Sequence, residues 1–336
     1  MNKQGINVLS CFDGMSCGRL ALEQVGVPVA NYFASEVDKY AMKVTQRNYP
    51  NTKQVGDITR IKGSDFPAID LLIGGSPCQG FSFAGKQLNF NDPRSRLFFE
   101  FVRLLEETKP TYFLLENVLM KKEYEQGITS LLGVEPILIN SALVSAQNRR
   151  RLYWTNIPHV TQPQDKGITW GDVRERGVNQ EKYYYSAQAM QWLARSSRKR
   201  NKTLTVHAEQ DKMQMLEASH HKKYSNQRFF GIPDLPESKH LAARMRAELS
   251  ADQPIEFQRD GSTLVTATKD GATMPFADGL PSGDFFFRYI TPLECERLQD
   301  VPDNFTGCVS DTQRYKMLGN GWTVGVIAHI FSSLEG

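Results

Sequence analysis

The segment from residue 6 to residue 25 reads INVLSCFDGMSCGRLALEQV, an apolar run, a glycine turn and a helical pattern in direct succession. Its spacing predicts a strand over 6–12 and a helix over 19–25. The same alternation predicts strands over 32–36, 69–73 and 112–115, and helices over 39–49 and 97–109. Alternating strands and helices indicate an α/β fold with a doubly wound, mostly parallel sheet. Ligands of such sheets bind beyond the carboxyl ends of the strands.

Length and composition describe a globular protein of about two domains. The chain has 336 residues, 23% of them charged, and a net charge of +3. After Pro158 the alternation gives way to polar, basic and aromatic sequence. We therefore expect one domain from 1–156 and 286–336, ending in a helix over 322–331, and a smaller mixed domain from 157–285. No apolar run reaches the roughly 20 residues that span a membrane, and no secretory signal is present. A cytoplasmic location follows.

The cysteines are odd in number and irregularly spaced, and no C-x-x-C pair occurs. This pattern disfavours both a disulfide framework and a structural zinc site. We expect no metal and interpret all five as reduced thiols: Cys11, Cys17, Cys78, Cys295 and Cys308.

The glycine turn after the first strand is the first candidate cofactor site. It lacks the G-x-G-x-x-G pattern, which disfavours a dinucleotide and a dinucleotide-dependent oxidoreductase. Glu36 lies 22 residues beyond Gly14, at the end of the second strand, and is suited to accept hydrogen bonds from ribose hydroxyls. These features favour a nucleoside cofactor such as S-adenosylmethionine, with its carboxylate near the helix N-terminus and its adenine against Phe12. A simple strand-to-helix turn is the alternative.

Two further strand ends carry reactive side chains. Cys78 lies in the loop GGSPCQGFS, residues 74–82, after the strand over 69–73. A lone cysteine is usually an inert buried residue, but this loop falls at the ligand-binding edge of the sheet. Glu116 follows the strand over 112–115 at the same edge. A carboxyl there is expensive to ionise unless paired, which favours a raised pKa and a general-acid role. A helix-capping glutamate is the alternative.

Basic residues form two groups. Gln147, Arg149 and Arg151 alternate, so in a strand they would present a row of donors on one face. Solvated charge is the alternative, and it fits poorly with the apolar LYW that follows at 152–154. Residues 195–228 hold nine Lys and Arg against three acids. Such a patch attracts a polyanion or forms a solvated surface.

Taken together, these motifs resemble those of the C5-cytosine-specific DNA methyltransferases. The resemblance covers the first 155 residues and the part from residue 286, in the family's order: P-C-Q at 77–79, E-N-V at 116–118 and Q-x-R-x-R at 147–151. Further matches are G-D-I at 56–58, T-P-L-E-C at 291–295 and G-N at 319–320. The family's F-x-G-x-G-G loop is altered, because Ser16 and Cys17 replace two glycines, and Ser10 stands where an acid is common. Both departures resemble the catalytic domain of the animal de novo DNA methyltransferases.

The resemblance implies methyl transfer from S-adenosylmethionine to C5 of a cytosine in double-stranded DNA. The Cys78 thiolate would add to C6 and Glu116 would hold N3, while Arg151, supported by Arg149, would bind O2 and orient Glu116. A base would then remove the C5 proton and free Cys78. Nearby arginines such as Arg149 would raise the thiolate fraction of Cys78. The implied cofactor residues are Phe12, Gly14, Met15, Glu36, Val37, Asp57, Ile58, Pro77, Leu97, Asn320 and Trp322.

A cytosine must leave the duplex to react, so a loop over 80–96 is expected to fill the gap. An ordinary surface loop is the alternative. The second domain would read the DNA sequence and bind phosphates with its basic patch. The expected DNA contacts are Gln79, Ser82, Lys86, Arg198, Lys199, Arg200, Lys222 and Lys223. The expected location is then the cytoplasm of a bacterial or phage-infected cell, close to the nucleoid.

Two alternative functions retain the fold. Some relatives methylate cytosine in transfer RNA, but the insertion over 157–285 favours duplex DNA. Others are silent binding modules that have lost the cysteine or the acid, whereas this chain retains Cys78, Glu116 and Arg151. A companion restriction endonuclease, the oligomeric state and the recognition sequence are left open by the sequence.

Overall fold

The structure is a computed structural model that describes most of the two regions predicted to form the first domain. The described residues are 5–76, 96–185, 204–206, 210–216, 218, 230–234, 236–241, 255–259, 263–267 and 286–334. Apart from Arg96, the predicted gap-filling loop over 80–96 lies outside them.

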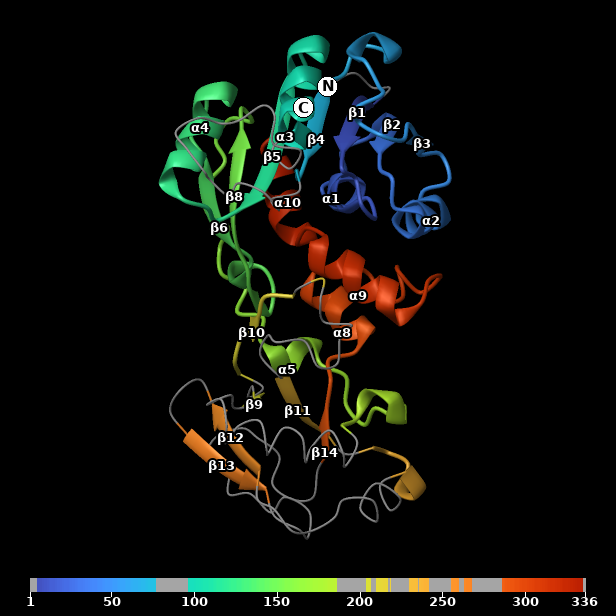
Figure 1. The fold of residues 1–336 in the computed structure, drawn as a ribbon, viewed down its shortest axis with the longest axis vertical. Coiled ribbons are helices and arrows are strands. Elements are labelled where there is room, and N and C mark those ends of the chain that lie inside the picture. The colour runs from blue at the N-terminus through green and yellow to red at the C-terminus, as the bar shows by residue number, and fades with distance from the viewer. Residues whose placement is uncertain are drawn as a thin grey trace.

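A seven-stranded sheet forms the larger part of the molecule, with the strand order β3-β2-β1-β4-β5-β8-β6 (Figure 1). Only β8 runs antiparallel to its neighbours β5 and β6, so the prediction of a mostly parallel sheet is confirmed. The strands are β1 Ile6–Cys11, β2 Val29–Ser35, β3 Lys53–Gln54, β4 Leu71–Gly74, β5 Tyr112–Val118, β6 Ile137–Asn140 and β8 Arg150–Thr155.

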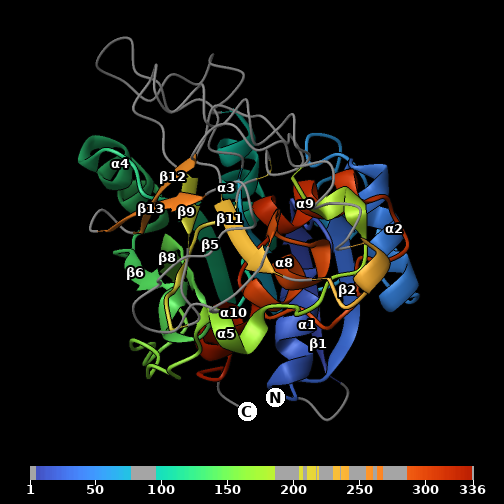
Figure 2. The ribbon, with the colours of Figure 1, turned by 90° about the horizontal axis from the view of Figure 1, so that it is seen from below.

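Helices cover both faces of this sheet, because its central strands direct apolar side chains to both sides. In β1, Val8 packs into one core cluster and Leu9 into the other. Figure 2 shows α3 and α4 on one side of the sheet and α1 and α10 on the other. The helices are α1 Cys17–Gln24, α2 Lys39–Asn48, α3 Arg96–Thr108, α4 Lys122–Leu132 and α10 Val324–Phe331.

Every predicted strand and helix is present, and the differences lie at the ends. The strand β5 continues to Val118, so Glu116 lies within the strand and not after it. The reason is pairing with β8, in which Glu116 stands opposite Tyr153. The strand expected through Gln147, Arg149 and Arg151 is interrupted at Arg149. Gln147–Asn148 form β7, which pairs with β10 Met213–Gln214 in a separate sheet.

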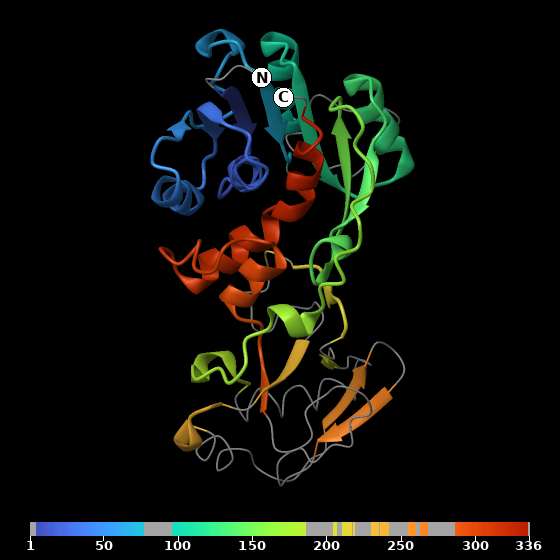
Figure 3. The same ribbon diagram turned by 180° about the vertical axis from the view of Figure 1, so that it is seen from behind.

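A second sheet lies at the far end of the molecule from the first (Figures 1 and 3). Its order is β13-β12-β9-β11-β14, with β9 Leu204–Val206, β11 Phe230–Asp234, β12 Ile255–Arg259, β13 Thr263–Ala267 and β14 Phe286–Arg288. Although β14 begins just beyond the predicted boundary at residue 285, it pairs with β11. The division into two domains stays a prediction. No helix in the described parts of the chain is long and apolar enough to cross a membrane.

A buried ion network fastens β14 to its surroundings. The fully buried Arg288 donates from Nε to Asp234 at 2.7 Å and from its Nη atoms to both oxygens of Glu294 at 2.8 and 2.7 Å. Burial alone would lower the pKa of Arg288, but Glu294 and Asp234 outweigh burial and raise it. Glu294 also completes the N-terminal capping box of α8 Pro292–Leu298. The network therefore joins the small sheet to the helices that lead to α9 Asp311–Asn320.

Candidate active site and cofactor cavity

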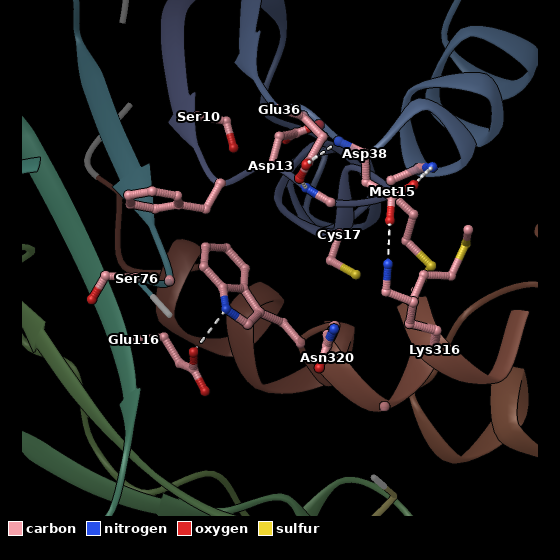
Figure 4. Close-up of a pocket in the computed structure, with 18 of the residues that line it drawn as sticks. Ser10, Asp13, Met15, Cys17, Glu36, Asp38, Ser76, Glu116, Lys316 and Asn320 are labelled. Atoms are coloured by element: carbon pink, nitrogen blue, oxygen red, sulfur yellow. Dashed lines mark hydrogen bonds and ion pairs between the residues drawn. The ribbon is translucent and has the colours of Figure 1, made fainter. Parts of the chain in front are cut away.

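A cavity of about 610 Å³ lies at the carboxyl ends of β1, β2, β4 and β5 (Figure 4). The loops that follow these strands supply lining residues 12–15, 36–38, 75–76 and 116–118, and residues 316–322 close the opposite side. The sequence predicted the four strand-end loops. It identified only Asn320 and Trp322 of the closing segment, and missed Lys316, Met317 and Gly321.

The carboxylate of Glu36 ties the first two loops together. Its Oε2 accepts from the backbone N–H of Gly14 at 2.8 Å, and its Oε1 accepts from those of Val37 and Asp38 at 2.7 and 2.8 Å. Oε2 accepts only one of these bonds and has a second lone pair, so the group retains capacity for a ligand hydroxyl. Val37 stands 73% exposed at the rim. Across the cavity, Lys316 Nζ donates to Asp38 Oδ2 at 2.7 Å.

Asp13 is a buried acid beneath the glycine turn that the sequence analysis did not identify. Its Oδ1 accepts from the Tyr32 hydroxyl at 2.8 Å and its Oδ2 accepts from the Ser16 hydroxyl. Burial raises the pKa of Asp13 to about 6. No Lys or Arg pairs with it in the described part of the chain. The sequence could have indicated Asp13, because it directly precedes the turn glycine Gly14 and so falls at the ligand-binding edge of the sheet.

Ser16 explains how the altered cofactor loop is held. It caps α1 in the left-handed conformation, with φ 62° and ψ 43°, which favours glycine. Its hydroxyl donates to Asp13 and lies 3.0 Å from that of Thr45 in α2. These polar contacts offset the backbone cost of a serine where the family pattern has glycine.

Glu116 lies between an arginine and an indole. Oε1 pairs with Nε of Arg151 at 3.0 Å, and Oε2 accepts from Nε1 of Trp322 at 3.0 Å. Glu116 and Arg151 are each 8% exposed, so both are placed by packing. A Cβ on Gly75 would lie 2.8 Å from Trp322 Nε1 and 3.1 Å from Glu116 Oε2, so only glycine leaves room for this pair.

The other two members of the Q-x-R-x-R motif point elsewhere. Arg149 donates to the main-chain carbonyls of Leu216, Gly319 and Gly321. Gln147 donates to the carbonyl of Leu298 at 2.6 Å and to Gln299. Only Arg151 contacts Glu116. Burial, together with the charge of Arg151, lowers the pKa of Arg149 to about 10.

Most of the predicted cofactor residues line the cavity: Phe12, Gly14, Met15, Glu36, Val37, Asn320 and Trp322. Three others do not. Ile58 and Leu97 pack into or against the core cluster on the α3 side of the sheet. The carboxylate of Asp57 accepts from the N–H and hydroxyl of Thr59, both at 2.9 Å, and these bonds lower its pKa.

Several predicted residues lie outside the described residues: Pro77, Cys78, Gln79, Ser82, Lys86, Arg198, Lys199, Arg200, Lys222 and Lys223. The last described residue before Cys78 is Ser76, which is buried, lines the cavity and accepts from Asn117 Nδ2 at 3.2 Å.

A doubly wound sheet with one reversed strand and an acidic, aromatic cavity at its strand ends defines a nucleoside-cofactor methyltransferase. Comparison with protein families then identifies it more closely. The family described as C-5 cytosine-specific DNA methylase matches residues 6–336, and the chain belongs to this family. It is therefore a DNA (cytosine-5)-methyltransferase that acts on DNA.

Relatives match along nearly the whole chain. The type II methyltransferase M1.ScrFI of Lactococcus lactis subsp. cremoris is 31% identical over 95% of this chain and 75% of its own length. M.NlaX of Neisseria lactamica is 29% identical over 98% of this chain and 96% of its own. Among solved structures, a DNMT2 variant of Spodoptera frugiperda is similar in fold, with a TM-score of 0.68 at 17% identity over 98% and 99% of the two chains.

Members of this family use S-adenosylmethionine as methyl donor, and the cavity suits that molecule. Its volume falls within the usual range for small-molecule sites. The carboxylates of Asp13 and Glu36 complement a ligand with sulfonium and ammonium charges, and Phe12 and Trp322 offer aromatic faces for a base. When bound, this group supplies an electrophilic methyl.

Proposed function

We propose that Cys78, Glu116 and Arg151 carry out the methylation of cytosine C5 in duplex DNA. The observation that supports this assignment is the buried Glu116–Arg151 ion pair, which lines the same cavity as Ser76, two residues before Cys78. A fixed carboxyl and a fixed guanidinium side by side match the N3 and O2 edge of a cytosine, which presents two adjacent polar atoms.

In this mechanism the Cys78 thiolate forms a bond to C6, and the electron pair of the C5–C6 double bond moves toward C5 and N3. Glu116, protonated or sharing a proton with N3, holds N3 and supplies the proton that neutralises the charge developing there, while Arg151 binds O2. C5 becomes enamine-like and acts as the nucleophile in methyl transfer. A base then removes the C5 proton, the C–H electron pair restores the double bond, and the C6–S bond breaks.

For the cofactor we propose that the loop from Phe12 to Met15 and the carboxylate of Glu36 hold the nucleoside. Val37 at the rim and Asn320 and Trp322 on the opposite wall would complete the site. Asp57, Ile58 and Leu97 are left out of this proposal, since none of them lines the cavity.

We further propose that residues 157–285 form the domain that recognises the DNA sequence, with the basic patch over 195–228 binding phosphates. Relatives named as type II methyltransferases favour a role beside a companion restriction endonuclease in a bacterial cytoplasm. Measuring the affinity for duplex DNA at several salt concentrations tests the phosphate contacts. Each phosphate that the protein neutralises releases counterions, so the affinity should fall steeply as the salt concentration rises.

Covalent trapping tests the central assignment. A duplex that carries 5-fluorocytosine at the target site, incubated with S-adenosylmethionine, should form a complex that survives denaturing electrophoresis. The Cys78→Ala variant should form none and should transfer no labelled methyl group. Cys308→Ala, which alters a half-buried cysteine away from the cavity, is the control and should behave like the native chain. Methylation at the native rate by Cys78→Ala would refute the assignment.

A further inference from the structure

Arg149 is a buried cation that is satisfied by carbonyl groups alone. It is 3% exposed and lies at the interruption between β7 and β8. Its guanidinium donates four hydrogen bonds, to Leu216 at 3.1 Å, to Gly319 twice at 3.3 Å and to Gly321 at 2.8 Å. No ion pair of Arg149 is found in the described parts of the chain. Burying a charge without a direct ion pair is costly, and the four carbonyl contacts, with the nearby charge of Glu116, offset part of that cost.

One of the carbonyls that Arg149 contacts, that of Leu216, belongs to the insertion over 157–285. The segment 210–216 lies within the region predicted to recognise DNA, yet it is anchored on the larger sheet's side of the molecule. Its strand β10 pairs with β7, and Met213 and Leu216 are buried in the main core cluster. Lys212 Nζ donates to the carbonyl of Ala142 at 2.7 Å. Gln147 Oε1 accepts from the backbone N–H of Leu216 at 3.3 Å, beside the bond from Arg149.

The other carbonyls that Arg149 contacts, those of Gly319 and Gly321, lie close in sequence to Trp322, the partner of Glu116. Gly319 and Gly321 flank the turn that ends α9, and the next residue is Trp322, whose indole holds Glu116. The carbonyl of Gly321 is fixed by Arg149 and also accepts from Gln299 Nε2 at 3.3 Å. The main-chain position of Gly321 sets where the Trp322 side chain leaves the backbone, and therefore where its N–H meets the carboxylate.

We propose that Arg149 is a positioning residue that links the 210–216 segment of the insertion to the Trp322–Glu116 pair. It acts through the main chain at Gly319 and Gly321 and does not touch Glu116 itself. The inference rests on the proposed role of Glu116. Only a planar group with several fixed donors reaches carbonyls in both segments at once, and a lysine ammonium at this position would serve one side and release the other.

A double-mutant cycle on kcat tests the link to Trp322. Arg149→Lys and Trp322→Phe should each lower kcat about 10-fold, with the KM for DNA nearly unchanged. Because both changes loosen the same carboxylate, the double variant should lose less than about 3-fold beyond either single variant. Arg150→Lys, an exposed neighbour, is the matched control and should keep native kcat. Independent effects, with a loss near 100-fold in the double variant, would overturn the proposal.

Amide hydrogen exchange tests the link in the native chain and does not depend on the stability of any variant. Binding of S-adenosylhomocysteine in the cavity should slow exchange in peptides covering 319–323 and also in 213–216, which does not line the cavity. Exchange in α4 should not change. Slowing confined to 319–323, or in neither peptide, would overturn the inference. A failed Cys78 trapping experiment would instead contradict the proposed function, so the two failures are distinguishable.

Discussion

Trp322 donates its indole N–H to Oε2 of Glu116 at 3.0 Å, although 206 residues separate the two in the chain. Arg151 takes the other oxygen, so both carboxylate oxygens are held and the plane of the group is fixed. Glu116 lines the cavity, and each of its oxygens retains one further lone pair. A carboxyl fixed in this way loses little entropy when it meets a base.

The first prediction concerns this carboxyl. Glu116→Gln keeps the size of the side chain but cannot share a proton with N3, so kcat for methyl transfer should fall by roughly 10² to 10⁴. Transfer of labelled methyl to duplex DNA measures it. Glu123→Gln, an exposed glutamate at the start of α4, is the control. Activity of Glu116→Gln within a few-fold of that control would contradict the role of Glu116.

The second prediction concerns the glycine beneath the pair. In Gly75→Ala the new methyl would approach Trp322 Nε1 to 2.8 Å, so the indole and Glu116 must shift. A displacement near 1 Å at a catalytic group costs about 100-fold in rate. In a Trp322→Phe background the clashing nitrogen is absent, and Gly75→Ala should cost much less. Single-turnover rates of the four proteins measure both effects; an equal cost in both backgrounds would argue against the clash.

The third prediction is a pH dependence of stability. Because burial raises the pKa of Asp13 from 3.8 to about 6, the folded protein binds this proton more tightly than the unfolded chain. The stabilisation is complete below pH 3.8 and is lost as the pH rises through about 6. Asparagine cannot ionise, so the unfolding free energy of Asp13→Asn relative to the native chain should increase by roughly 2 to 3 kcal/mol between pH 4 and pH 8. Urea denaturation at several pH values measures this difference.

Asp303 supplies a control of opposite sign. Its hydrogen bonds to Arg297 lower its pKa, so the native chain should lose this stabilisation as the pH falls and keep it at neutral pH. Asp303→Asn should therefore be less stable than the native chain at pH 7 and approach it in acid. If the stability of Asp13→Asn relative to the native chain fell with rising pH, as is expected for Asp303→Asn, the pKa of Asp13 would not be raised in the folded protein.

The fourth prediction separates two contributions of Ser16 to stability: its hydroxyl contacts and the strain of its left-handed backbone. Ser16→Ala loses the contacts with Asp13 and Thr45 and keeps a Cβ in the left-handed region, whereas Ser16→Gly loses the same contacts but removes that strain. The glycine variant should be more stable than the alanine variant by about 1 kcal/mol. Both should be less stable than the native chain. Thermal unfolding of the three proteins ranks them, and an alanine variant as stable as the glycine variant would contradict the strain.

The sheet and its helices could be predicted because apolar periodicity is a local property of the chain. The buried alternation in β1 and the apolar face of α3 are visible in consecutive residues. The ends were less certain, because the length of β5 depends on its antiparallel partner β8, which lies more than 30 residues further along the chain. No local signal at Glu116 indicates that the strand continues past it.

The site was predicted at its strand-end loops and less well where distant segments meet. Glu116 and Arg151 were named, and they form the expected pair. Arg149 was expected beside them, but alternation in a strand does not reveal that the ladder breaks at this residue. Once it breaks, the guanidinium is free to turn toward the carbonyls of Gly319 and Gly321. Asp13 was missed because its burial and its bond from Tyr32 depend on β2, which follows later in the chain, although Ser16 nearby also donates to it.

The wall formed by residues 316–322 has a consequence for synthesis of the protein. A ribosome completes every strand of the large sheet, together with Cys78 and Glu116, long before it reaches Trp322. Until then the cavity at the strand ends lacks the wall formed by residues 316–322, and the carboxylate of Glu116 lacks its indole partner. If Cys78 and Glu116 act as proposed, a nascent chain stalled before this segment holds both groups beside an incomplete cavity, and methylation should begin only after residues 316–322 have emerged.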